Sequence, residues 1–196
     1  TKADKHFAKL EFVEAAEAYT KLVEKGEADA YVYGQLAEAN YNIFNTVEAE
    51  KWYAKALESS SDSEMLYKYS EMLKANGKYD ASNQQMRTFA AANPSDERAK
   101  AFLANPNYLN DILAKEEKYT AKNLEFNSSA SDFGGTLKDG KLYITSARND
   151  ARRNYGWNDQ PYLDIYELTL AEDGTYSEAN LLKGKWTHLK VKSKTE

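Results

Sequence analysis

The sequence predicts an α+β protein, in which an array of helical hairpins is followed by an antiparallel β segment. Two observations predict this fold class. Residues 1 to 118 are rich in Ala, Glu, Lys, Leu and Tyr, whereas most of the glycines lie after Asn127. Apolar residues recur at helical spacing in the first part and alternate with polar residues in the second. We therefore expect two domains, residues 1–118 and residues 119–196.

Composition excludes several classes of function. The net charge is −5, and the acidic and basic residues are interspersed, so no basic stripe is present that would bind a run of phosphates. We therefore expect no nucleic-acid partner. The sequence contains no cysteine, which excludes disulfides and thiol nucleophiles within it. No segment approaches the roughly 18 consecutive apolar residues that a membrane-spanning helix needs.

A repeat of about 34 residues runs through the first domain. One pattern of positions occurs three times: at Phe12, Ala15, Tyr19, Leu22 and Val23, at Thr46, Ala49, Tyr53, Ala56 and Leu57, and at Tyr79, Ser82, Met86, Phe89 and Ala90. The small residue in second place lets the two helices of a hairpin approach closely, and the larger residue one turn later fills the gap to the next repeat. A period near 34 is typical of stacked helix-turn-helix units.

Turn residues separate the expected helices. Gly26 and Gly77 supply turns between helices, and Pro94 closes the third repeat. Ser95 then begins a further helix that ends at Asn105-Pro106. We expect a last short helix, from about residue 107 to 117, to cover the open apolar end of the array.

The second repeat resembles the tetratricopeptide repeat family, on the residues Tyr33, Leu36, Ala37, Tyr41, Ala49, Tyr53, Ala56 and Leu57. The first repeat keeps little of its leading helix, so we expect the array to be trimmed or capped at its amino end. The resemblance implies that the first helix of each hairpin lines a concave groove. It also implies a non-enzymatic scaffold that binds other proteins.

In this register, eight side chains are expected to face the groove: Tyr31, Glu38, Tyr41, Asn42, Glu64, Tyr67, Glu71 and Lys74. A tyrosine-rich, acidic groove suits an extended peptide or a basic segment of a partner protein. The competing interpretation is that the tyrosine rings are buried between repeats and the glutamates are solvated. The groove lacks the cluster of Lys and Arg with which some arrays clamp a carboxylate tail.

The second domain has the signals of an antiparallel sheet. Asp139-Gly140 predicts a tight turn, and an alternating strand follows it at residues 141–146. A second strand is expected within residues 162–170, before a turn at residues 172–174. We expect three or four antiparallel strands, and four short strands make one blade of a β-propeller.

Three segments of this domain, NSSASDFGG (127–135), TSAR (145–148) and YGWNDQPYLDIY (155–166), resemble multidomain OmpA-family envelope proteins of Bacteroidetes-type bacteria. Members of that family join tetratricopeptide repeats to a propeller of WD-like blades, a β-sandwich and an OmpA-like domain that binds peptidoglycan. Some members belong to the type IX secretion and gliding machinery. The resemblance implies that residues 119–196 form the first blade or part of it.

The same resemblance implies a location and a partner. We expect the protein on the periplasmic side of the outer membrane, after removal of a signal peptide. The expected partner is another envelope protein or a peptide segment held in the helical groove. Peptidoglycan would be bound only through domains that these residues do not include.

The loop between the predicted strands offers an alternative function through Arg148, Arg152, Arg153 and Trp157. Arginines beside an exposed Trp suit an anionic glycan, so carbohydrate or peptidoglycan-fragment binding is the second hypothesis. The competing structural interpretation is a lattice of Arg–Asp pairs, with Trp157 packed in a propeller loop. A third hypothesis is a spacer without a partner. No nucleophile, phosphate-loop or metal-ligand motif is recognisable, so we expect no catalytic residue, metal or cofactor.

Overall fold

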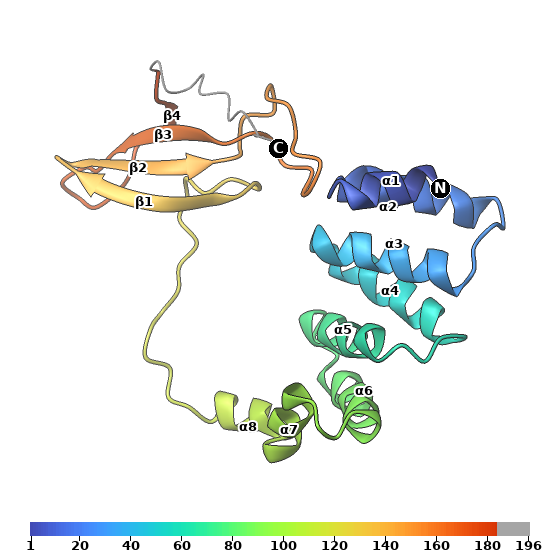
Figure 1. Ribbon diagram of the computed structural model, residues 1–196. Helices are drawn as coiled ribbons and strands as arrows, with labels where there is room; N and C mark the ends of the chain where they lie inside the picture. Colours follow the sequence, from blue (N-terminus) through green and yellow to red (C-terminus); the bar gives the residue numbers. More distant parts are fainter. Residues whose placement is uncertain (184–196) are drawn as a thin grey trace. The chain divides into compact units, whose positions relative to one another are not determined.

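The computed structural model of this chain describes residues 1–183, and within them helices and strands are segregated along the sequence (Figure 1). All of the described helices lie before Lys118, and all of the described strands lie after Tyr119. The predicted α+β class is therefore confirmed. The last part of the expected β domain, residues 184–196, lies outside the described residues.

The helical unit consists of hairpins that follow one another along an array, α1/α2, α3/α4 and α5/α6, and α7 and α8 come after them (Figure 1). Each helix packs on the next in the order of the sequence from α1 to α7. The arrangement is tetratricopeptide-like. The helices are α1 Lys2–Ala8, α2 Phe12–Glu24, α3 Ala30–Asn42, α4 Thr46–Leu57, α5 Ser63–Ala75, α6 Tyr79–Ala92, α7 Glu97–Ala104 and α8 Tyr108–Leu113.

Polar caps fix where the first helix of each later hairpin begins. The side chain of Asp29 accepts a hydrogen bond from the backbone N–H of α3, and Asp62 does the same for α5. Such a cap satisfies one of the otherwise unpaired N–H groups at a helix start. In α7 the cap is Asp96 rather than the expected Ser95, because the carboxylate of Asp96 accepts from the N–H of Arg98.

The second and third positions of the predicted repeat pattern are buried in the core of the array, whereas Tyr79, at the first position, is 38% exposed. The small residues Ala15, Ala49 and Ser82 are fully buried, so the paired helices are in close contact there. One turn later, Tyr19 and Tyr53 are also fully buried. The second helix of each of the first three hairpins begins at the same repeat position, which confirms the repeat register derived from the sequence.

The turn inside each of the first three hairpins contains one residue with left-handed backbone. These residues are Leu10 (φ 61°), Phe44 (φ 59°) and Gly77 (φ 75°), and they occupy equivalent repeat positions. Glycine adopts this conformation without strain, whereas other L residues do so at a cost of about 1 kcal/mol or more. Leu10 and Phe44 therefore carry side chains where the turn itself favours glycine.

The last helix covers little of the apolar end of the array. Helix α8 is shorter than expected and contains no buried residue. Tyr108 and Leu109 are half-buried, but Ile112 and Leu113 are exposed. A short helix is therefore present at the expected place, but its own apolar residues Ile112 and Leu113 remain in solvent.

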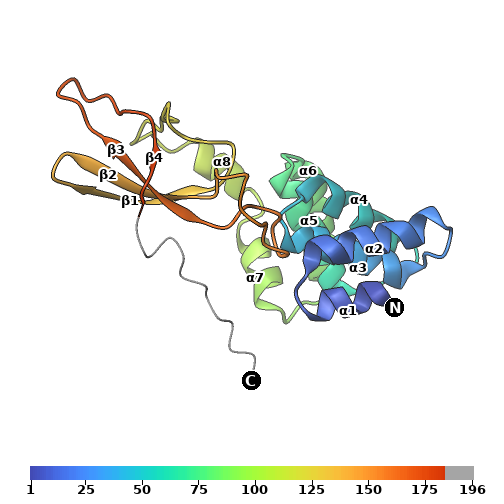
Figure 2. The ribbon, with the colours of Figure 1, turned by 90° about the horizontal axis from the view of Figure 1, so that it is seen from above.

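The strands form one antiparallel sheet in the order β1-β2-β3-β4, as Figures 1 and 2 show. They are β1 Asp132–Lys138, β2 Lys141–Ser146, β3 Asp164–Thr169 and β4 Asn180–Leu181. Asp139 and Gly140 both have positive φ (51° and 72°), which is the backbone of a type I′ hairpin turn. The turn predicted from the Asp-Gly pair is thus present between β1 and β2.

One face of the sheet carries the core of the β unit. Ile144, Tyr166 and Leu168 are buried there, and Phe126 and Tyr176 pack against them. Part of the sheet remains uncovered, since Phe133 is 52% and Ile165 38% exposed. The described residues hold a sheet of four strands, which is the size of one propeller blade.

We predict that Ser82→Ala stabilises the helical array by about 1 kcal/mol. The buried hydroxyl of Ser82 has no hydrogen-bond partner among the described residues, and the equivalent positions hold Ala15 and Ala49. Urea denaturation followed by helical circular dichroism would measure the change. The reverse variant, Ala49→Ser, should lower stability by a similar amount, and a destabilised Ser82→Ala protein would contradict this account.

Candidate protein-binding surfaces

The eight predicted groove residues lie on the leading helices α3 and α5, where neighbouring leading helices meet. Four come from α3 and four from α5: Tyr31, Glu38, Tyr41 and Asn42, and Glu64, Tyr67, Glu71 and Lys74. We name this surface the inner face. Tyr31 is half-exposed, whereas Tyr41 and Tyr67 are partly buried against neighbouring rings. Tyr31 is therefore accessible to a ligand, as the groove interpretation expects, while Tyr41 and Tyr67 are packed in part within the array, as the competing interpretation expects.

In each of the first two hairpins, a hydrogen bond from a buried tyrosine to a carboxylate joins the two helices of that hairpin. The hydroxyl of Tyr19 donates to Asp4 at 2.6 Å, and that of Tyr53 donates to Glu38 at 2.7 Å. Donor and acceptor both recur one repeat later. In the third repeat Met86 replaces the tyrosine, and the equivalent carboxylate, Glu71, instead pairs with Lys74 at 2.8 Å.

A second set of contacts joins each leading helix to the next. The hydroxyl of Tyr31 donates to Asp4 at 3.0 Å, and Lys68 donates to Glu38. Arg98 of α7 donates to both carboxylate oxygens of Glu64, at 3.2 and 2.9 Å. These bonds run from one repeat to its neighbour, so they fix the stacking of successive hairpins.

The cations of Lys68 and Arg98 also contact aromatic rings of the inner face. The guanidinium of Arg98 lies 4.2 Å from the ring centroid of Tyr67, and the ammonium of Lys68 lies 4.9 Å from that of Tyr41. Such cation–π contacts contribute about 0.5–1 kcal/mol at exposed sites. Each of these rings and its cation therefore cover part of each other's surface.

The carboxylates of the inner face are therefore neutralised within the array. Glu38, Glu64 and Glu71 each form an ion pair with a side chain of the same unit. Sequence analysis identified these acids but missed Lys68 and Arg98. The repeat register was the available signal, because Arg98 lies 34 residues after Glu64 and so falls on the same face of the next leading helix.

Burial and the carboxylate partners change the titration of the tyrosines. Burial, together with the hydrogen bond to Glu38, raises the pKa of Tyr53 far above its ordinary value of 10.0. Burial and Asp4 raise the pKa of Tyr19 in the same way. Both hydroxyls therefore remain protonated donors across the physiological range.

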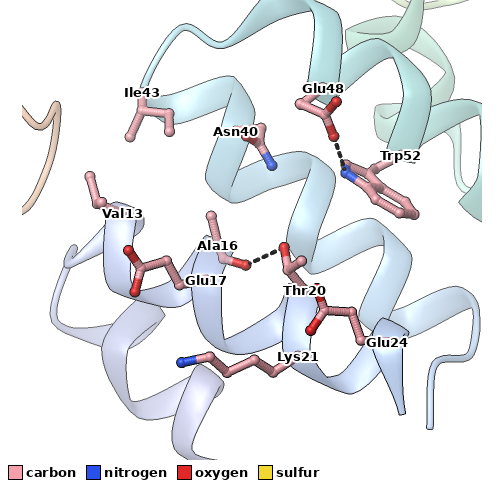
Figure 3. Close-up of a pocket in the computed structure, with 10 residues that line it drawn as sticks. All are labelled: Val13, Ala16, Glu17, Thr20, Lys21, Glu24, Asn40, Ile43, Glu48 and Trp52. Carbon is pink, nitrogen blue, oxygen red and sulfur yellow. Dashed lines mark hydrogen bonds between the residues drawn. The ribbon is translucent and has the colours of Figure 1, made fainter. Parts of the chain in front are cut away.

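A second surface lies on the opposite helices of the hairpins. A hollow of about 380 Å³ separates α2 from α4 over the end of α3, and Figure 3 shows its walls. We name it the outer groove. Its lining consists of Val13, Ala16, Glu17, Thr20, Lys21, Glu24, Asn40, Ile43, Glu48 and Trp52. Sequence analysis did not identify it, because no repeat motif marks these positions together.

The loop arginines of the β unit are partly used by the fold. Arg148 donates to Asp132 at 2.8 Å, to the hydroxyl of Ser146 at 2.9 Å and to the carbonyl of Phe126 at 3.0 Å. Desolvation opposes ionisation of Asp132, but hydrogen bonds from Ser146 and Arg148 prevail and hold its pKa at about 2. Arg148 therefore ties the segment before β1 to the end of β2.

Arg152 has a similar structural role. It donates to both oxygens of Asp164, whose carboxylate is almost completely buried and also accepts from Asn149 at 2.9 Å. The side chains of Arg153 and Trp157 are exposed, and Trp157 is 51% exposed. Arg148 and Arg152 thus hold the fold, and Arg153 and Trp157 have exposed side chains.

Within residues 1–183, no group of three or more His, Asp or Glu side chains is arranged to hold a metal ion. In the same part of the chain, no helix is both long enough and apolar enough to cross a bilayer.

Comparison with solved structures finds similarity to tetratricopeptide repeat domains. One is the second such domain of human RPAP3, solved in complex with an HSP70 peptide; it is 24% identical, with a TM-score of 0.46, over 53% of this chain and 88% of that chain. Another is the C-terminal part of a repeat-containing protein from Cytophaga hutchinsonii, 20% identical with a TM-score of 0.44, over 57% of this chain and 43% of that chain. This chain thus matches less than half of the second structure. No family model and no curated protein matches the sequence.

We predict that Tyr53→Phe destabilises the array by about 1.5 kcal/mol, because it removes a buried hydrogen bond to a charged group. Tyr41→Phe is the matched control, since the hydroxyl of Tyr41 has no hydrogen-bond partner among the described residues. Urea denaturation would measure both. Equal losses in the two variants would contradict the role given to the Tyr53 hydroxyl.

Because of the Tyr53 hydroxyl, the stability of the array depends on pH in the alkaline range. The folded-state pKa of Tyr53 is raised above its unfolded value, so its contribution is complete below about pH 10 and is lost as the pH rises further. Tyr53→Phe should therefore show a smaller loss of stability above pH 10 than the unchanged protein.

We predict that Arg148→Lys loosens the sheet, because a lysine cannot reproduce the planar set of donors to Asp132, Ser146 and Phe126. Amide hydrogen exchange at Ile144 and Tyr166 should become about tenfold faster, which corresponds to 1.4 kcal/mol. Arg153→Lys is the control and should leave these rates unchanged. Unchanged exchange in Arg148→Lys would overturn the assignment.

Proposed function

We propose that this chain is a non-enzymatic scaffold that binds an extended segment of another protein along its inner face. The observation that carries the proposal is the row of ion pairs and tyrosines along α3, α5 and α7. These contacts hold the leading helices at a fixed spacing and present rings and paired charges in order along the array. A preorganised surface of this kind binds a peptide with little loss of conformational entropy.

The pairing of the acids determines which partner the inner face suits. Because Glu38, Glu64 and Glu71 are already neutralised, a strongly basic segment would have to displace Lys68, Arg98 or Lys74. A segment with alternating polar and aromatic or aliphatic side chains fits better. Its backbone would bond to Asn42 and Glu71, and its side chains would pack on the tyrosines.

We further propose a cell-envelope setting on the periplasmic side of the outer membrane. The support is the resemblance of residues 127–135 and 155–166 to OmpA-family envelope proteins with a propeller. In this proposal the four-stranded sheet is a propeller blade, and its exposed Phe133 and Ile165 pack on the next blade. Within this setting, the most specific role that we propose is one in type IX secretion or gliding.

Binding of a carbohydrate or a peptidoglycan fragment is the second candidate function. The exposure of Trp157 and Arg153 favours it. Arg148 and Arg152 weigh against it, because both form ion pairs within the fold. Calorimetric titration with soluble peptidoglycan fragments tests it. Heat of binding that disappears in Trp157→Ala would support this candidate, and absence of heat with the unchanged chain would remove it.

We predict that a combined Tyr41→Ala and Glu71→Lys variant loses its protein partner. The first change removes a ring from the inner face, and the second places a repelling charge beside Lys74. Affinity purification from an envelope extract, with the whole chain as bait and mass spectrometry of the retained proteins, identifies the partner. Its affinity for the variant, measured with the purified partner, should fall by about tenfold or more.

Glu27→Lys is the matched control, because Glu27 is exposed in the loop between α2 and α3. A partner that binds both variants as well as the unchanged chain would contradict the inner-face proposal. Failure of the unchanged chain to retain any specific protein would favour the spacer hypothesis instead.

A further inference from the structure

The outer groove has a buried polar floor that the fold does not need. Asn40 of α3 is 5% exposed, and Figure 3 shows it between the α2 side chains Ala16 and Thr20 and the α4 side chains Glu48 and Trp52. Its amide nitrogen donates to the carbonyl of Leu36 at 2.8 Å. Its amide oxygen accepts no hydrogen bond from any described residue. This oxygen is therefore the hydrogen-bond acceptor that Asn40 presents to the hollow.

The next repeat shows that an apolar side chain can occupy this position. The equivalent residue, 33 positions later, is Leu73, which is 3% exposed. A leucine buried at this position stabilises the fold through its apolar area, which a polar asparagine contributes less of. The array thus carries an asparagine where its own repeat accepts leucine, and a donor that enters the groove would satisfy it.

The walls of the outer groove specify the charge of that donor. Glu17 and Glu24 of α2 line the groove, and neither forms an ion pair with a described residue. Glu48 lines the opposite wall, where the indole N–H of Trp52 donates to it at 2.8 Å and Lys51 pairs with it at 3.0 Å. Lys21 is the basic residue of the lining. Acidic groups therefore outnumber basic ones, and two of them are free to bind a cation.

The inner face differs in this respect. Its three glutamates all have internal partners, so a cationic ligand gains little there. Charge complementarity therefore favours the outer groove for a basic ligand.

An exposed apolar residue is adjacent in the sequence to the outer groove. Phe44 directly follows Ile43, which lines the groove, and the ring of Phe44 is 75% exposed. Its backbone has the left-handed conformation that Gly77 adopts at the equivalent turn. The fold alone would favour glycine or asparagine here, although the equivalent turn of the first hairpin also holds an exposed apolar residue, Leu10. The Phe44 side chain is thus available for contact with a ligand.

We propose that the outer groove binds an extended basic segment of a partner protein, with one Arg or Lys side chain inserted between α2 and α4. The inserted cation donates to the amide oxygen of Asn40. Glu17 and Glu24, which lie two turns apart on α2, attract this cation and the neighbouring basic side chains of the segment. An aliphatic neighbour in the segment packs on Phe44. This second surface goes beyond the proposed function, because it does not involve the inner face.

The test uses the whole chain and a capped peptide of alternating arginine and leucine as the probe. The probe's affinity is measured by fluorescence anisotropy, and its location by chemical-shift changes in the amide NMR spectrum. We expect the largest shifts at Thr20, Asn40 and Ile43. Asn40→Leu should weaken binding by about tenfold or more and raise thermal stability, because the leucine reproduces Leu73.

Two further variants separate the contributions of charge and apolar contact. Glu17→Gln combined with Glu24→Gln should weaken the probe by about tenfold and reduce the dependence of its affinity on salt. Phe44→Asn should weaken it while leaving the fold at least as stable, since asparagine tolerates left-handed backbone. Glu71→Gln, on the inner face, is the control and should bind as the unchanged chain does.

Three outcomes would overturn the proposal. The first is no binding of the probe to the unchanged chain. The second is binding to Asn40→Leu within about twofold of the unchanged chain. The third is a set of chemical-shift changes centred on Tyr41, Tyr67 and Glu71, which would place the probe on the inner face. A peptide with glutamate in place of arginine should not bind, and equal binding of that peptide would also contradict the proposal.

Discussion

The helical array depends on the close approach of two helices at one small residue per repeat, with a larger side chain, a tyrosine in the first two repeats, packed one turn further on. Ala15 and Ala49 are fully buried at the crossings, and Tyr19 and Tyr53 fill the space that opens beyond them. Each tyrosine hydroxyl also reaches a carboxylate on the leading helix of its own hairpin. A single aromatic side chain thus supplies both apolar burial and the polar contact that sets the pairing of its two helices.

The same carboxylates connect that pairing to the stacking of repeats. Glu38 accepts from Tyr53 within its hairpin and from Lys68 of the next one. The acidic residues that the sequence analysis assigned to the groove are therefore already bonded to side chains of the array on the inner face. On the opposite side, Glu17 and Glu24 have no such partner within the described chain. The two surfaces of one array thus differ in the ligands that their charges suit.

In the β unit, ion pairs at the strand ends replace part of the packing that a small sheet lacks. Ile144, Tyr166 and Leu168 bury one face, but a single sheet of four strands has little core. Arg148 and Arg152 tie the loops to Asp132 and Asp164, and Asp164 is almost fully buried. These arginines therefore contribute to the fold, which is the structural interpretation that competed with ligand binding.

The sequence by itself determined the α+β class, the repeat near 34 residues, the buried positions and the Asp-Gly hairpin turn. It could do so because these features depend on neighbours along the chain: helical spacing, small residues at fixed intervals and the backbone preference of glycine. Only the tertiary structure decided that Lys68 neutralises Glu38 and that Asn40 forms the floor of a groove between α2 and α4. Those features depend on which side chains of different repeats meet in space, and spacing along the chain does not specify that.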